Sequence, residues 1–136
     1  MGLDQYVYAL KMKQNTKDRL YKPSLFSDPL FRFSDEMHKQ KVLIHDWRKH
    51  PDIHGWMEEM YISRGGTEIF NCVPLYLTEF DIECLETSII NKSLPKTSGF
   101  FFGESLKENY QNDMEFIEKA KNKQAKGFHI FYDSWW

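Results

Sequence analysis

The side chains best suited to binding or proton transfer gather in residues 45–61, which read HDWRKHPDIHGWMEEMY. This segment holds two of the four tryptophans, three of the five histidines and an Arg-Lys pair. Pro51 suits the first turn of a helix, where its missing N–H is no loss, and it favours extended backbone at His50. The sequence therefore predicts a helix that begins between His50 and Asp52 and ends near Tyr61.

Several of these side chains fall where an anion could bind. Trp47, Arg48 and Lys49 come directly before the first turn of the predicted helix, where unpaired backbone N–H groups favour negative charge. Four-residue spacing places His50 and His54 on one face of the same helix. The arrangement predicts a position that holds a phosphate group beside an aromatic ring.

A second segment, LPKTSGFFFG at residues 94–103, has the composition of a turn followed by a short strand. Lys96, Thr97, Ser98 and Gly99 form the predicted turn, which offers an ammonium group, two hydroxyls and a permissive backbone. The three phenylalanines that follow are too few for a helix and predict a buried strand. The turn is not a Walker loop, because the spaced GxxxxGK[ST] pattern is absent.

Size, charge and cysteine content restrict the class of protein. A chain of 136 residues predicts one domain, and 18 basic against 20 acidic residues give no overall basic surface for nucleic acid or an anionic membrane. Cys72 and Cys84 lack a CxxC spacing, and the sequence has neither a secretory signal nor a long apolar run. We therefore expect reduced, buried thiols, a cytoplasmic location and no contact with a membrane.

The pattern of elements predicts a single α+β domain over residues 1–136. A mixed, mostly antiparallel sheet packs against about three α-helices in this prediction, with an irregular excursion at residues 14–40 that is anchored by Leu25, Phe26, Leu30, Phe31 and Phe33. The excursion either covers a site or is a surface insertion. Strands are predicted at residues 3–11, 41–47, 68–73, 100–102 and 128–136, and helices at 50–61, 79–91 and 105–125.

Four segments in order resemble a family of small uncharacterised proteins encoded by bacteriophages and prophages. They are MGLD at residues 1–4, WRK at 47–49 with IHGW at 53–56, TSGFFFG at 97–103, and FYDSW at 131–135. The resemblance spans nearly the whole domain but not residues 14–39, and the His50-Pro51-Asp52 insert departs from the small or polar residues usual there. It implies a phage protein that acts in the cytoplasm of a bacterial host, and it supplies no catalytic residues.

The first functional hypothesis is a site for a phosphorylated or nucleotide-like small molecule. Trp47 or Trp56 would stack on a base, Arg48, Lys49 and Lys96 would contact phosphate, and Thr97, Ser98 and Gly99 would donate hydrogen bonds. Taken singly, the tryptophans are more often core residues and the turn is more often an ordinary turn. Their combination within the segments that carry the resemblance favours the binding hypothesis.

The second hypothesis is an enzyme that acts on phosphoester or phosphoanhydride bonds. His54 would be the general acid or base, with Arg48 stabilising negative charge and Asp4, Asp46 or Asp52 orienting the imidazole. A hydrogen-bonded, partly buried histidine is the favoured alternative for His54. No metal site is expected at His50 and His54, because a third ligand and the HExxH pattern are missing.

The third hypothesis is a module that inhibits a host protein through the excursion and the terminal aromatic residues. It predicts a large exposed aromatic patch, whereas a small-molecule binder would place Trp47, Arg48 and His54 around a concave pocket. We favour the binding protein, which would sequester a nucleotide-derived ligand such as a host defence signal, without a cofactor and without turnover. The host target and the oligomeric state, a homo-oligomer included, stay open.

Overall fold

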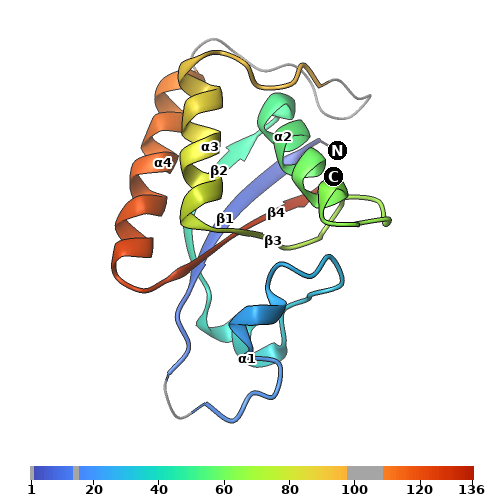
Figure 1. Ribbon diagram of the computed structural model, residues 1–136, viewed down its shortest axis with the longest axis vertical. Coiled ribbons are helices and arrows are strands. Elements are labelled where there is room, and N and C mark those ends of the chain that lie inside the picture. Colours follow the sequence, from blue (N-terminus) through green and yellow to red (C-terminus); the bar gives the residue numbers. More distant parts are fainter. Residues whose placement is uncertain (1, 14–15, 98–108) are drawn as a thin grey trace.

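Two strands from distant parts of the sequence lie side by side at the centre of the sheet. Strand β1 (Asp4–Leu10) pairs with β4 (His129–Trp135) along its whole length. Strand β2 (Val42–Arg48) pairs with the other side of β1, and β3 (Leu75–Leu77) pairs with β4. The strand order is therefore β2-β1-β4-β3 (Figure 1).

The computed structural model describes residues 2–13, 16–97 and 109–136. Within these residues the chain forms the α+β domain that the sequence predicts, and each strand pairing is antiparallel rather than mixed. The predicted strand at residues 100–102 lies outside the described residues. None of the helices in the described ranges is both long and apolar enough to cross a membrane.

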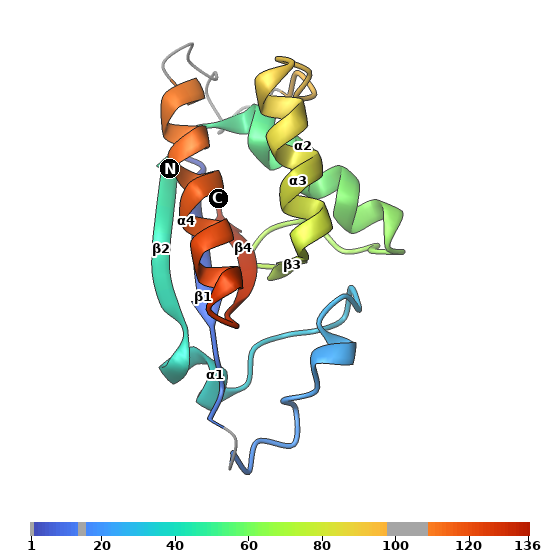
Figure 2. The ribbon, with the colours of Figure 1, turned by 60° about the vertical axis from the view of Figure 1, so that its left-hand side comes forward.

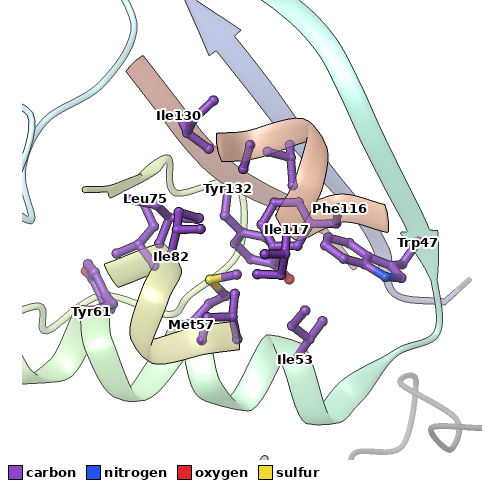
Figure 3. Close-up of a cluster of buried hydrophobic side chains, with 14 of the residues drawn as sticks. Trp47, Ile53, Met57, Tyr61, Leu75, Ile82, Phe116, Ile117, Ile130 and Tyr132 are labelled. Atoms are coloured by element: carbon purple, nitrogen blue, oxygen red, sulfur yellow. The ribbon is translucent and has the colours of Figure 1, made fainter. Parts of the chain in front are cut away.

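Three helices cover one face of the sheet (Figure 2): α2 (Pro51–Ser63), α3 (Glu79–Ile90) and α4 (Asn109–Ala125). Strand β1 alternates strictly, so Gln5, Val7 and Ala9 are buried beneath these helices. The main apolar core fills the space between the two layers, as Figure 3 shows. Its largest members include Trp47, Met57, Tyr61, Phe116 and Tyr132.

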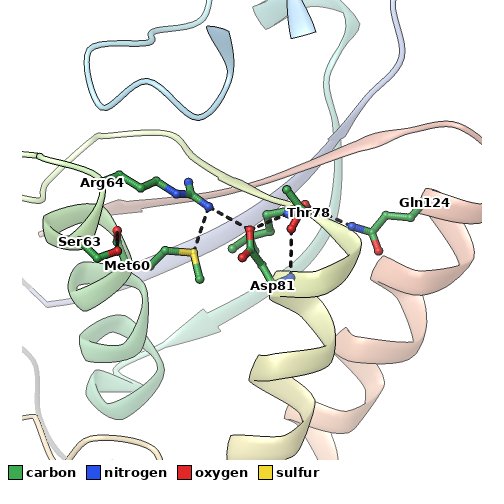
Figure 4. Close-up of polar contacts among 7 residues, drawn as sticks. Met60, Ser63, Arg64, Thr78, Asp81 and Gln124 are labelled. Atoms are coloured by element: carbon green, nitrogen blue, oxygen red, sulfur yellow. Dashed lines mark hydrogen bonds and ion pairs between the residues drawn. The ribbon is translucent and has the colours of Figure 1, made fainter. Parts of the chain in front are cut away.

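The ends of the helices are fastened by polar contacts (Figure 4). Thr78 and Asp81 form a capping box at the start of α3, in which each side chain accepts a hydrogen bond from the other residue's backbone N–H. Arg64, just after α2, donates to the Asp81 carboxylate at 2.9 Å, and Gln124 of α4 donates to the Leu77 carbonyl at 3.2 Å. These contacts fix α2 and α4 relative to the start of α3.

The excursion covers part of the opposite face and is more ordered than predicted. It contains a 3-10 turn, η1 (Pro23–Leu25), and a short helix, α1 (Asp35–Gln40), whose first turn is capped by the Ser34 hydroxyl. Phe26 and Phe31 are buried against Leu10 and Phe131. The predicted anchors Leu25 and Leu30 were wrong: they are 42% and 73% exposed, because the chain around η1 turns them outward.

The predicted strand at residues 68–73 is wrong, and the third strand begins only after Pro74. Residues 66–72 instead wrap around the Tyr61 side chain, whose hydroxyl accepts a hydrogen bond from the Glu68 N–H at 3.1 Å. Cys72 adopts a left-handed backbone with φ 59°, which a continuous strand does not allow. Its side chain is exposed and that of Cys84 is half-buried, so the expectation of two buried thiols was also wrong.

Candidate functional site

A carboxylate buried in the helical layer holds two residues of the predicted site region. Asp113 of α4 accepts a hydrogen bond from the Trp47 indole N–H at 2.9 Å, and its other oxygen lies 2.9 Å from His50 Nε2. All three side chains are at most 5% exposed. A charge in such a place persists only where both oxygens have partners, and here they do.

Gln5 extends this network across the sheet. Its side-chain carbonyl accepts from the His50 backbone N–H at 2.9 Å, and its amide N–H groups donate to the His50 carbonyl at 3.0 Å and to the Tyr132 hydroxyl at 3.1 Å. Tyr132 then contacts His54 Nδ1 at 2.7 Å. The buried polar network therefore runs without a break from Trp47 to His54 and fixes the backbone at the start of α2.

Burial determines the protonation states of His54 and Tyr132, at one end of this network. It lowers the pKa of His54 to about 4 and raises the pKa of the Tyr132 hydroxyl. At neutral pH, His54 is thus uncharged and Tyr132 is protonated. The Tyr132 hydroxyl therefore accepts a hydrogen bond from Gln5 and shares a second one with His54 Nδ1.

Two cationic residues of the predicted site, Arg48 and Lys49, are exposed just before α2. Arg48 has a side chain that is 71% exposed, with Nε 3.7 Å from the Asp4 carboxylate. Lys49 is exposed as well, adopts a left-handed backbone with φ 59°, and donates its backbone N–H to the Leu3 carbonyl at 2.7 Å. Since the next residue is held by Gln5, both cationic side chains extend from a backbone that is fixed on either side.

The loop that follows α3 meets the first turns of α2 at Thr97. The Thr97 backbone N–H donates to Asp52 Oδ1 at 3.0 Å, and the Thr97 side chain lies against Gly55. A Cβ atom at Gly55 would come within 1.8 Å of Thr97 Oγ1, so only glycine allows this approach. Lys96, next to Thr97, is exposed.

The structure therefore separates the predicted site residues into two groups. The first group lies at the surface: Arg48 and Lys49 come directly before α2, and Lys96 precedes Thr97, which contacts Asp52 and Gly55 of α2. Trp47 and His54 lie in the interior, and Trp56 is partly buried against the core. Ser98 and Gly99 lie outside the described residues.

Three members of the network were missed in the sequence: Gln5, Asp113 and Tyr132. Asp113 did leave a signal, because it occupies the same helical stripe as Phe116, Ile117 and Ala120, all of which are buried. A carboxylate at an apolar position of a helix predicts a buried partner. Gln5 gives a similar signal, because it lies on the same face of β1 as the apolar Val7. Tyr132 has no pattern that distinguishes it from an ordinary core residue.

The larger grooves of the described surface lie away from these residues. A groove of about 690 Å³ lies between the start of the excursion and α1, and a groove of about 510 Å³ lies between β2 and α4. The described ranges hold no group of three His, Cys, Asp or Glu side chains placed to share a metal ion. None of the grooves found in the described ranges is lined by Arg48, Lys49 or Lys96.

Comparisons with protein-family models, with curated proteins and with solved structures find no match to this chain.

Proposed function

We propose that this protein binds the phosphate of a nucleotide-derived or otherwise phosphorylated small molecule at the start of α2 and sequesters it without turnover. The observation that supports the proposal is the meeting of two cationic segments there. Arg48 is the last residue of β2, and Lys49 follows it just before the start of α2. Lys96 belongs to the loop whose Thr97 N–H donates a hydrogen bond to Asp52 Oδ1 at 3.0 Å. An anion at this position would interact with three positive charges from two parts of the chain.

The helix end itself adds to this attraction. His50 occupies the N-cap position, but its imidazole contacts Asp113 and makes no capping hydrogen bond. Pro51 at the first position has no N–H, and the N–H groups of the following residues carry the positive end of the helix dipole. Asp52 would oppose an anion less than an unpaired carboxylate does, because one of its oxygens already accepts the Thr97 N–H.

The position of His54 supports binding rather than catalysis. The side chain is 1% exposed, and its Nδ1 contacts Tyr132 at 2.7 Å. A general acid or base must reach the proton that it transfers. The proposal therefore assigns recognition to the surface cations and leaves His54 in the scaffold that supports them.

A phage context would give this binding a purpose. The resemblance of residues 47–56 and 97–103 to phage proteins favours a role in the host cytoplasm, where a protein that captures a phosphorylated defence signal would protect the phage. Under this proposal the ligand leaves the site intact.

Titration calorimetry against inorganic phosphate, ATP, ADP-ribose and cyclic oligonucleotides tests the proposal. We expect one of these classes to bind, and R48A together with K49A to weaken its binding by about 10- to 100-fold, as the loss of charged hydrogen bonds would. K39A is the matched control, because Lys39 is an exposed lysine of α1 at the far end of the molecule. Equal affinity in the double variant and the wild type would refute the site.

Chromatography of the bound ligand separates binding from turnover. Recovery of the intact compound after incubation is the expected result. Recovery of a cleaved product would contradict sequestration and would require a catalytic group near the phosphate.

A further inference from the structure

The sheet face opposite the helices has an uncovered half. Residues of β1 that alternate with the buried Gln5, Val7 and Ala9 point to this side. The excursion packs against its Leu10 end, where Leu10 and Phe131 are buried. We call the remaining half the open face, and it consists of Asp4, Tyr6, Tyr8, Leu43, Asp46, Arg48, Asp133 and Trp135.

Strand register arranges the open face in three rows. Leu43 lies opposite Tyr8, Asp46 and Asp133 lie on either side of Tyr6, and Arg48 and Trp135 lie on either side of Asp4. A bulge in β2 between the partners of Val7 and Tyr8 keeps Leu43 on this side. The rows therefore present apolar side chains at both ends and an acidic row in the middle.

The apolar ends are accessible. Trp135 is 62% exposed and Leu43 is 49% exposed. The rings of Tyr6 and Tyr8 lie between them, stacked with centroids 6.2 Å apart. Accessible aromatic side chains on β1 and β4, with a leucine on β2, resemble the anchors that dominate protein interfaces.

The middle row carries two carboxylates, those of Asp46 and Asp133. Arg48 lies 3.7 Å from Asp4, but within the described ranges no cationic side chain forms an ion pair with Asp46 or Asp133. Burial raises the pKa of the Asp133 carboxyl although the charges of Lys41, His38 and Arg32 act to lower it, and burial together with Asp4, Asp46 and Asp133 raises the pKa of Tyr6. A further positive charge placed over Tyr6 would lower both pKa values.

The chain itself shows that this face accepts a cation. The Lys41 ammonium group lies 4.1 Å from the centroid of the Tyr8 ring and 5.2 Å from that of Phe33. This is cation–π geometry. Tyr6, one row further along β1, presents the same kind of ring between two carboxylates.

We propose that the open face docks a basic segment of another protein, with an arginine side chain stacked on Tyr6 between Asp46 and Asp133 and apolar side chains against Trp135 and Leu43. Asp46 and Asp133 lie two strand spacings apart, roughly 10 Å, which leaves room for a guanidinium group between them. Arginine fits better than lysine because its planar group stacks on an aromatic ring while its N–H groups reach carboxylates. A flat face with apolar ends fits a polypeptide, whereas small molecules need a concave pocket.

Fluorescence anisotropy with a labelled peptide of alternating arginine and leucine residues tests this proposal. We expect saturable binding that D46N and Y6L each weaken on the order of fivefold, in line with the loss of one carboxylate contact or one cation–π contact. E83Q is the matched control, because Glu83 is an exposed carboxylate of α3, a helix that covers the opposite face of the sheet. Equal weakening by E83Q would mean general attraction to negative charge and would refute the open face as the site.

Two further probes remove the remaining alternatives. A peptide with lysine in place of arginine should bind more weakly than the arginine peptide, and equal affinity would refute the stacked guanidinium. Free arginine methyl ester should not compete at the peptide's concentration; competition at that level would show a small-cation site and overturn docking of a protein segment. Phosphate binding at the start of α2 should be unaffected by Y6L, so the two proposals fail independently.

Discussion

The two faces of β1 differ in whether the carboxylates near them have partners. On the helical side, Gln5 joins a network in which both oxygens of a buried carboxylate have partners. On the other side, Tyr6 stands between carboxylates that form no ion pair among the described residues. Trp47, His50 and Asp113, whose residue types first suggest chemistry, therefore hold the interior together, whereas Tyr6 and the carboxylates beside it lie on the other face of the sheet.

The largest expected effect comes from removing the carboxylate of the helical side. D113A would leave the Trp47 N–H and His50 without their buried partner, so we expect the free energy of unfolding to fall by about 3–5 kcal/mol. Urea unfolding followed by tryptophan fluorescence measures this loss. N112A, at the neighbouring and less buried position of α4, should cost less than about 1 kcal/mol. If D113A left the free energy of unfolding unchanged, the helical side would not depend on its polar contacts. The contrast between the two faces of β1 would then fail.

Acid should weaken the helical side through His54. Its pKa is about 4 in the fold and 6.5 when unfolded, so the unfolded state takes up the proton first. Stability is therefore complete above pH 6.5 and is lost as the pH falls toward 4. The loss is about 2 kcal/mol at pH 5.

Unfolding curves at pH 7.5 and pH 5.0 measure this dependence. His45 and His129 add to it in the same direction, because burial lowers the pKa of both. H54Q should reduce the difference between the two pH values, and H38Q, at an exposed position of α1, should leave it unchanged. An equal pH dependence in H54Q and the wild type would remove His54 from the explanation.

A smaller effect is expected where the loop meets α2. G55A would place a methyl group against Thr97 Oγ1, at 1.8 Å in the present geometry, so the loop must move. Overpacking costs about 1–3 kcal/mol, and alanine regains about 1 kcal/mol of helix propensity, which leaves a net loss of up to about 2 kcal/mol. The same variant should weaken phosphate binding, because Lys96 moves with the loop.

The double variant G55A/T97S separates the two causes. Serine lacks the Thr97 methyl group but keeps the hydroxyl, so only part of the stability should return. Full stability in G55A alone would show that the loop does not press against the helix.

The smallest effect should have the opposite sign. Burial raises the pKa of the Asp133 carboxyl, so the ionised form destabilises the fold above that pKa, and D133N should slightly raise the urea midpoint at pH 7. D113N, the same chemical change on the helical side, should lower it. If both variants shift the midpoint in the same direction, the distinction between the two faces fails.

Local patterns were sufficient to predict most of the framework. The alternation around Val7, the Pro51 start of α2, the Thr78 cap of α3 and the apolar spacing near Ile117 depend on neighbours within a few residues, and the structure confirms each of these elements. Phe80 and Ile90 are apolar residues of the helix predicted at residues 79–91, but they are 71% and 50% exposed, because they lie just beyond its buried stripe.

What the sequence did not reveal depends on residues far apart. The contact between Trp47 and Asp113 joins two elements separated by 66 positions, and no local pattern predicts such a pair. The third strand was placed too early because residues 68–73 contain β-formers but must turn around Tyr61. The short helix α1 was missed although Ser34, followed by two acidic residues, is an ordinary capping signal.

The position of β1 and β4 in the sheet has a consequence for how the protein acquires its structure. Asp4 pairs with Trp135, so the two central strands can meet only after almost all of the described chain has been synthesised. Long-range pairing of this kind makes folding slow, on the order of milliseconds to seconds. Until β4 is synthesised, β1 has β2 alone as a partner strand, so its other edge stays unpaired and open to association with other chains.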